Sequence, residues 1–134
     1  MKQSELLKRQ HTEIMDLINE IESSIKDKSN NQNENIVKLI NSLSGKLKVH
    51  LSIEDKHLYP ELLNSTKYRE IAFKYMDEMG NLVNEYNSFK TKFNTPSKLA
   101  LGIKDFEKES EKVFSLLRKR IIKEDNELYQ LCSE

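Results

Sequence analysis

The sequence predicts an all-α protein that folds as an antiparallel, up-down-up-down four-helix bundle. Apolar residues recur with the spacing 4,3,4,3 in four segments, which is the period of a helix with one buried face. The 134 residues contain only three Gly and two Pro, too few for an all-β chain with many tight turns. Short polar connections separate the segments, and they force neighbouring helices to run antiparallel.

The four helices are expected, in chain order, at residues 4–28, 34–63, 66–93 and 97–131. In the first, Ser4 is expected as the N-cap, and an apolar stripe extends from Leu7 to Ile25. In the second, isoleucine and leucine recur until Pro60, which should lie near the C-terminal end because proline disfavours helical backbone before it.

The third and fourth helices carry stripes of the same rhythm. The third stripe is rich in aromatic residues and runs from Tyr68 to Phe93, whereas the fourth runs from Leu99 to Leu128. The segments SNNQNEN, NST and NTPSK separate the four helices. Asn, Ser, Thr and Pro are typical of turns and helix caps, so these segments are expected to be the connections.

Composition limits the function further. Lys and Arg total 22 and so do Asp and Glu, so no basic field favours nucleic acid or an anionic membrane. There is no apolar run of about 18 residues, and the polar start predicts no signal peptide. The only cysteine is Cys132, which is consistent with a reducing compartment. We therefore expect one cytoplasmic domain over residues 1–134, with no membrane or nucleic-acid partner.

Five ionisable residues fall on stripe positions that the pattern assigns to the core: His11, His50, Glu54, Arg120 and Glu124. Burying an ion without a partner costs several kcal/mol, so these groups should meet one another or a bound ion. Residues equidistant from a turn lie at one level of an antiparallel pair. By this rule the five residues and Met79 are predicted to share one layer of the bundle.

The chain also repeats itself weakly. The segment HLSIEDKHLYPEL, which begins at His50, aligns with RIIKEDNELYQLC, which begins at Arg120. The first and third helices align as well, and this alignment sets His11 against Met79. The two helical hairpins therefore look like copies, of which the first has two histidines where the second has Met79 and Arg120.

These residues resemble the hemerythrin-like, or HHE cation-binding, domain family. Its signature is a His on the first helix and His-x-x-x-Glu, an acidic residue and Leu-Phe/Tyr-Pro on the second, repeated on the third and fourth. The chain matches the first half with His11, His50, Glu54 and the Leu-Tyr-Pro that ends at Pro60. The resemblance covers essentially the whole chain. It implies a non-heme iron site that binds oxygen, senses oxygen or nitric oxide, or takes part in iron and nitrosative-stress handling.

Carried over to this chain, the resemblance implies that His11 and His50 ligate one metal ion and that Glu54 and Glu124 bridge two. Histidines at positions 79 and 120 would hold the second ion, and they are absent. The remaining imidazoles and carboxylates suit iron, manganese or zinc, and we expect iron. One ion is favoured over two.

Arg120 is predicted to take the place of the second ion. A guanidinium stays protonated and cannot ligate a cation, but it can pair with Glu54 and Glu124. Met79 is expected to fill the space left on the third helix. Tyr75, one turn away, could offer a phenolate ligand, although a core tyrosine is the stronger interpretation. His57 and Glu61 are expected at the surface.

Three functions remain open on these grounds. The favoured one is metal binding at a modified, one-ion site that binds or senses O2 or NO or handles iron. The alternative is a metal-free bundle that acts as a protein-interaction or regulatory module. The third is weak oxidative catalysis at iron. No nucleophile beside a base and no phosphate-binding loop is recognisable, so the protein is not expected to be an enzyme.

Overall fold

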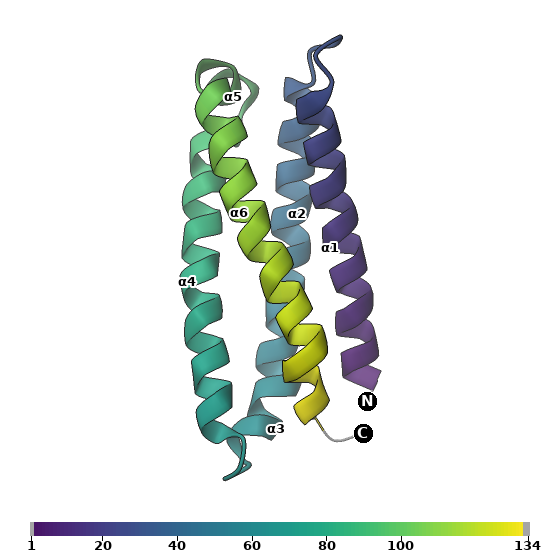
Figure 1. The fold of residues 1–134 in the computed structure, drawn as a ribbon, viewed down its shortest axis with the longest axis vertical. Coiled ribbons are helices and arrows are strands. Elements are labelled where there is room, and N and C mark those ends of the chain that lie inside the picture. The colour runs from purple at the N-terminus through teal and green to yellow at the C-terminus, as the bar shows by residue number, and fades with distance from the viewer. Residues whose placement is uncertain (1, 133–134) are drawn as a thin grey trace.

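The computed structural model describes residues 2–132, and helices packed along one long axis make up almost all of this range (Figure 1). The elements are α1 (Lys2–Lys26), α2 (Asn33–Ile53), the π-helical turn η1 (Glu54–Leu58), α3 (Tyr59–Leu63), α4 (Arg69–Phe93), α5 (Pro96–Leu101), α6 (Ile103–Lys123), the π-helical turn η2 (Glu124–Leu128) and the 3-10 turn η3 (Tyr129–Leu131). The long helices alternate in direction along the chain. The predicted antiparallel all-α bundle is therefore confirmed. Within the described range, no helix is both long and apolar enough to cross a membrane.

The helix boundaries differ from the predicted ones in two informative places. Helix α1 begins at Lys2, so Ser4 lies inside its first turn and the prediction of Ser4 as N-cap was wrong. The fourth predicted helix, 97–131, is interrupted at Gly102, between α5 and α6. A Cβ atom at Gly102 would lie 3.2 Å from Cε1 of Phe93, so the interruption brings the backbone tightly against the end of α4. The Thr95 side chain caps α5 by accepting a hydrogen bond from the Lys98 N–H.

Two π-helical turns occupy equivalent places in the two halves of the chain. One begins at Glu54 and the other at Glu124, and each is followed directly by a tyrosine, Tyr59 or Tyr129. In each turn the tyrosine N–H donates to the carbonyl of the glutamate five residues earlier. Single π turns within α-helices occur frequently at functional sites. The weak sequence repeat is thus matched by a repeated backbone feature.

The core consists of two apolar clusters with a polar layer between them. The larger cluster holds, among others, Ile14 of α1, Leu47 of α2 and five aromatic residues of α4 and α6: Tyr86, Phe89, Phe93, Phe106 and Phe114. The smaller one, near α3, holds Leu7 and Leu58, among others. Along α1, His11 lies between Leu7 of the smaller cluster and Ile14 of the larger cluster. The same change of cluster occurs along the other long helices, and the buried ionisable residues lie at these changes.

Phe89 anchors the larger cluster. Its ring lies 5.5 to 6.0 Å from the rings of four other aromatic residues, measured between centroids, and it is almost fully buried. We expect Phe89→Ala to lower the free energy of unfolding by about 3–5 kcal/mol, the usual loss for a buried aromatic side chain. Urea unfolding followed by circular dichroism measures this. Phe73→Ala on the same helix is the control, because Phe73 is 56% exposed and should change stability by no more than about 0.5 kcal/mol. Equal losses would contradict this description of the core.

Candidate metal centre

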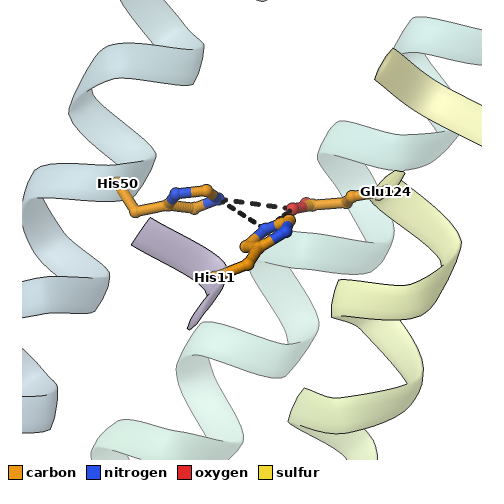
Figure 2. Close-up of side chains that lie close together, drawn as sticks. All are labelled: His11, His50 and Glu124. Carbon is orange, nitrogen blue, oxygen red and sulfur yellow. Dashed lines mark hydrogen bonds and ion pairs between the residues drawn. The ribbon is translucent and has the colours of Figure 1, made fainter. Parts of the chain in front are cut away.

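Three buried side chains from three helical segments converge at the polar layer. His11 comes from α1, His50 from the last turn of α2 and Glu124 from the first residue of η2. Figure 2 shows the three side chains pointing toward one another. One ligand atom from each lies within 4.8 Å of the other two.

The facing atoms are close enough to bind a single ion. The two imidazole Nε2 atoms of His11 and His50 are 3.1 Å apart. Glu124 Oε1 lies 2.8 Å from Nε2 of His11 and 3.3 Å from Nε2 of His50. In a metal site with bonds of about 2.1 Å, neighbouring ligand atoms lie about 3.0 Å apart when the bonds meet at right angles. The triangle formed by these three atoms has that size.

The other nitrogen of each ring is held by an oxygen acceptor. His11 donates from Nδ1 to Oδ1 of Asp125 at 2.8 Å, and His50 donates from Nδ1 to Oε1 of Gln10 at 2.9 Å. With the protons on Nδ1, the lone pairs of both neutral rings are on Nε2, at the facing positions. Partners of this kind fix the tautomer and orientation of metal-ligating histidines.

With both protons on Nδ1, the two Nε2 lone pairs face each other at 3.1 Å and repel, so a cation between these nitrogens stabilises the pair. In the metal-free protein, a proton can supply the positive charge. Burial disfavours a charged His50, but its contacts with Glu124 and Glu54 outweigh burial and raise the pKa of His50 to about 9. The site therefore favours positive charge at the point where the three side chains meet.

The two carboxylates of the layer have different environments. Burial disfavours the charge of Glu124, yet its contacts with His11 and His50 and the charge of Arg120 hold its pKa well below the usual range. Burial and the neighbouring Glu124 raise the pKa of Glu54. Glu54 contacts His50, with Oε2 lying 3.2 Å from Nε2, but it lies outside the group of three donors.

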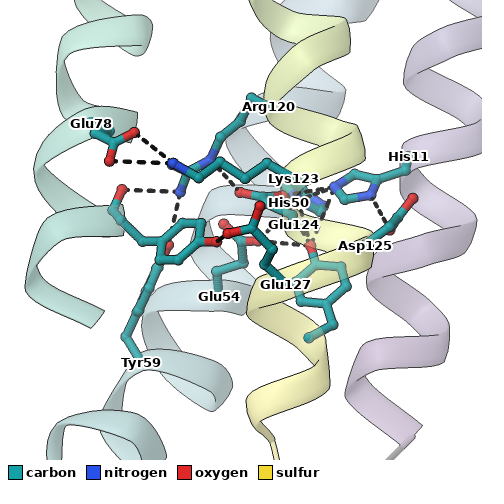
Figure 3. Close-up of polar contacts among 12 residues, drawn as sticks. His11, His50, Glu54, Tyr59, Glu78, Arg120, Lys123, Glu124, Asp125 and Glu127 are labelled. Atoms are coloured by element: carbon teal, nitrogen blue, oxygen red, sulfur yellow. Dashed lines mark hydrogen bonds and ion pairs between the residues drawn. The ribbon is translucent and has the colours of Figure 1, made fainter. Parts of the chain in front are cut away.

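Arg120 contacts the opposite side of Glu124 (Figure 3). Its Nε donates to Oε2 of Glu124 at 2.8 Å, and its Nη2 donates to the Tyr59 hydroxyl at 3.2 Å and to the Tyr75 carbonyl at 3.0 Å. The guanidinium also lies 4.9 Å from the centre of the Tyr75 ring. The two oxygens of Glu124 thus face different partners: Oε1 faces the histidines and Oε2 faces Arg120.

The remaining residues singled out in the sequence lie around this centre. Met79 is buried in the larger apolar cluster. The hydroxyl of Tyr75 donates to Glu127 at 2.9 Å, so its nearest polar partner is not a member of the three-donor group. His57 and Glu61 are exposed. Contacts through Glu124 and His50 link His11, His50, Glu54, Arg120 and Glu124. Of the two glutamates with which Arg120 was predicted to pair, its hydrogen bond goes to Glu124.

Several residues of the site were missed from the sequence. Asp125 and Gln10 orient the histidines, and the Tyr129 hydroxyl donates to Oε2 of Glu54 at 2.8 Å. Burial and the carboxylates Glu124 and Glu54 raise the pKa of Tyr129. The repeat had marked Asp125 and Tyr129, because the acidic pair and the Leu-Tyr pair recur in both halves. Gln10 had no such signal.

The donor set fits a metal ion. Two neutral imidazoles and an ionised carboxylate match the ligands that iron, manganese and zinc take in proteins. Oε1 of Glu54 is buried and has no hydrogen-bond partner within the described residues, which leaves one more carboxylate oxygen in the layer. His11, His50 and Glu124 are the residues that would hold the ion.

Comparison with known proteins agrees with this centre. Residues 3–132 match the hemerythrin family, described as the hemerythrin HHE cation binding domain. Neither a curated protein nor a solved structure matches the chain. The match spans nearly the whole sequence, and it confirms the family resemblance drawn from the motif around His50. The chain belongs to the hemerythrin HHE cation-binding domain family.

Proposed function

We propose that this protein binds one non-heme iron ion at His11, His50 and Glu124, and that the bound ion serves to bind or sense a small diatomic ligand such as O2 or NO, or to handle iron. The observation that carries the proposal is the convergence of Nε2 of both histidines on Oε1 of Glu124, with distances of 2.8 to 3.3 Å. Both rings are held by second partners that favour this geometry.

The chemistry of the donors supports iron. Two histidines and one carboxylate on one side of an ion are typical of non-heme iron sites that keep coordination positions open. Such an ion would supply an open position for a small ligand. Manganese and zinc also accept these donors. The surrounding apolar clusters bury the three side chains, so solvent competes weakly for the site.

Arg120 supports one ion over two. A second ion bridged by Glu124 would need Oε2 of that residue, and the guanidinium of Arg120 already donates to this oxygen at 2.8 Å. Its fixed positive charge also repels a neighbouring cation. We infer that Arg120 supplies the charge that the second ion would have supplied. Glu54 would then not bridge two ions.

We propose binding in preference to catalysis, because the side chains of the centre are ligands, their orienting partners and a guanidinium. The alternative is a metal-free bundle whose polar layer only fixes the core and whose surface binds a protein. The raised pKa of His50 supports that alternative, since a protonated His50 would supply positive charge to the layer without metal.

Metal content separates these functions. Protein expressed with added iron should contain about one iron ion per chain by elemental analysis, and a chelator should lower its melting temperature, because an ion bound only by the folded state stabilises it. His11→Ala should lose the ion and the chelator effect. His57→Ala is the matched control, because His57 is exposed, and it should retain both. Metal-free wild-type protein, or His11→Ala that keeps its iron, would contradict the proposal.

The inference about Arg120 predicts that a second ion can be restored. Met79 and Arg120 occupy the two positions at which the resemblance implies histidines. The double variant Met79→His, Arg120→His adds two imidazoles and removes the fixed charge beside Oε2 of Glu124. We expect its iron content to rise to about two per chain. Two ions in the wild-type protein would overturn the role given to Arg120.

A stability comparison tests the same role without metal. Arg120 and Arg118 lie two residues apart on α6, and each pairs with a glutamate, but Arg120 is 7% exposed and Arg118 is 29% exposed. In the presence of a chelator, Arg120→Ala should reduce the free energy of unfolding by about 3–5 kcal/mol, because Glu124 loses a buried partner. Arg118→Ala should cost no more than about 1 kcal/mol. Urea unfolding measures both, and similar losses would show that Arg120 does not balance Glu124.

A further inference from the structure

We propose that Tyr129 is a fourth ligand of the metal ion, with its phenol oxygen joining His11, His50 and Glu124. This inference rests on the proposed function, because it concerns the same ion. The ligands that the family motif implies for this chain are histidines and glutamates, and a tyrosine is not among them. The inference follows from the position of the Tyr129 hydroxyl oxygen.

The Tyr129 hydroxyl oxygen lies close to all three donor atoms. It is 3.2 Å from Nε2 of His11, 3.2 Å from Nε2 of His50 and 3.1 Å from Oε1 of Glu124. The three donors are themselves 2.8 to 3.3 Å apart. All six separations are therefore nearly equal, so the four atoms occupy the corners of an almost regular tetrahedron.

The size of this tetrahedron matches a metal site. When corners are 3.1 Å apart, as the two Nε2 atoms are, each corner lies about 1.9 Å from the centre, close to the metal–nitrogen and metal–oxygen bonds of about 2.0–2.2 Å in proteins. Four polar atoms at this distance from one point can all bind a single ion, and an open position for a small ligand then comes from expansion to five-coordinate. Among the described residues, no other side-chain oxygen makes hydrogen-bonding contacts with all three donors.

Glu54 is the competing candidate for the fourth ligand. Its Oε2 lies 3.2 Å from Nε2 of His50, but Glu54 is outside the group whose ligand atoms all lie within 4.8 Å of one another. Oε2 instead accepts the hydrogen bond of Tyr129 at 2.8 Å. We therefore assign Glu54 as a positioning residue, which acts on the ion through Tyr129.

This hydrogen bond also gives the phenol proton a destination. If Tyr129 bound the ion as a phenolate, its O–H bond would break and an O–H bond would form at Oε2 of Glu54. The proton moves between two oxygens that are 2.8 Å apart, and the combined charge of the two residues stays the same. No further reactant is needed.

The π-helical turn explains how Tyr129 reaches the site. In a regular α-helix, residues five apart point about 140° away from each other around the axis. In η2 the Tyr129 N–H bonds to the Glu124 carbonyl, which widens the turn and aligns the two side chains. The equivalent turn η1 has the same backbone bond between Tyr59 and Glu54, and the Tyr59 hydroxyl accepts from the guanidinium of Arg120 at 3.2 Å. Tyr59 thus faces the positive charge of Arg120, and Tyr129 faces the point between His11 and His50 at which we place the metal ion.

Visible absorption of the ferric protein tests this assignment. Wild-type protein is loaded with ferrous iron without oxygen, and the iron is then oxidised with ferricyanide. A phenolate bound to ferric iron gives a charge-transfer band in the visible range, and excitation in this band enhances the ring vibrations of the bound tyrosinate in the Raman spectrum. We expect both signals in the wild-type protein.

Matched variants identify the tyrosine. Tyr129→Phe should lose both signals and bind iron at least about tenfold more weakly, as measured by competition with a chelator. Tyr59→Phe removes the equivalent hydroxyl of the other half, and Tyr75→Phe removes the hydroxyl that donates to Glu127. Both variants should keep the signals. If Tyr129→Phe folds poorly, the Raman spectra of the wild-type protein and of the two control variants still test the assignment. The tyrosinate signal should then be present in all three proteins.

The outcomes separate this inference from the proposed function. One iron per wild-type chain without a tyrosinate signal, or a signal that persists in Tyr129→Phe, would overturn Tyr129 as a ligand and leave the one-ion site intact. A signal that disappears in Tyr59→Phe or Tyr75→Phe but not in Tyr129→Phe would have the same effect. Wild-type protein that binds no iron would overturn both.

Discussion

The buried carboxylate of Glu124 is the group around which the centre of the molecule is arranged. Taking a carboxylate out of water costs several kcal/mol unless charged or hydrogen-bonding partners replace the water. Here Arg120 donates to one oxygen at 2.8 Å, and His11 lies 2.8 Å from the other. The positions of Asp125 and Gln10 follow from this, because each holds a histidine ring in the orientation that faces Glu124.

Each half of the chain contains a buried glutamate whose negative charge needs a positive partner, and the partners differ between the halves. Both begin a π-helical turn at a buried glutamate and end it before a tyrosine. Beside the first turn, the positive charge belongs to a side chain of the protein, because the Arg120 guanidinium donates to the Tyr59 hydroxyl. Beside the second turn, the imidazoles of His11 and His50 face the Tyr129 hydroxyl. A proton or a metal ion would supply the positive charge there. An asymmetric centre of this kind suits one ion.

The apolar clusters on either side give this layer its strength. They bury the ionisable side chains almost completely, and electrostatic interactions are stronger where water is excluded. The same burial makes an unpaired group costly, so removal of one partner affects the others. We therefore regard the polar layer as a unit, in which the energy of one residue cannot be assigned without its neighbours.

The sequence by itself determined the bundle, its order of helices and the identity of most buried ionisable residues, because a helix of constant period places residues three and four apart on one face. It also determined that Arg120 and Met79 stand where the first half has histidines. The helix interruption at Gly102 and the two π-helical turns became visible only in the tertiary structure, because neither a close approach to Phe93 nor a five-residue backbone bond leaves a signal in the apolar period. Tyr129 was missed as a member of the centre for this reason: the regular period points it away from Glu124, and the widened turn brings it back.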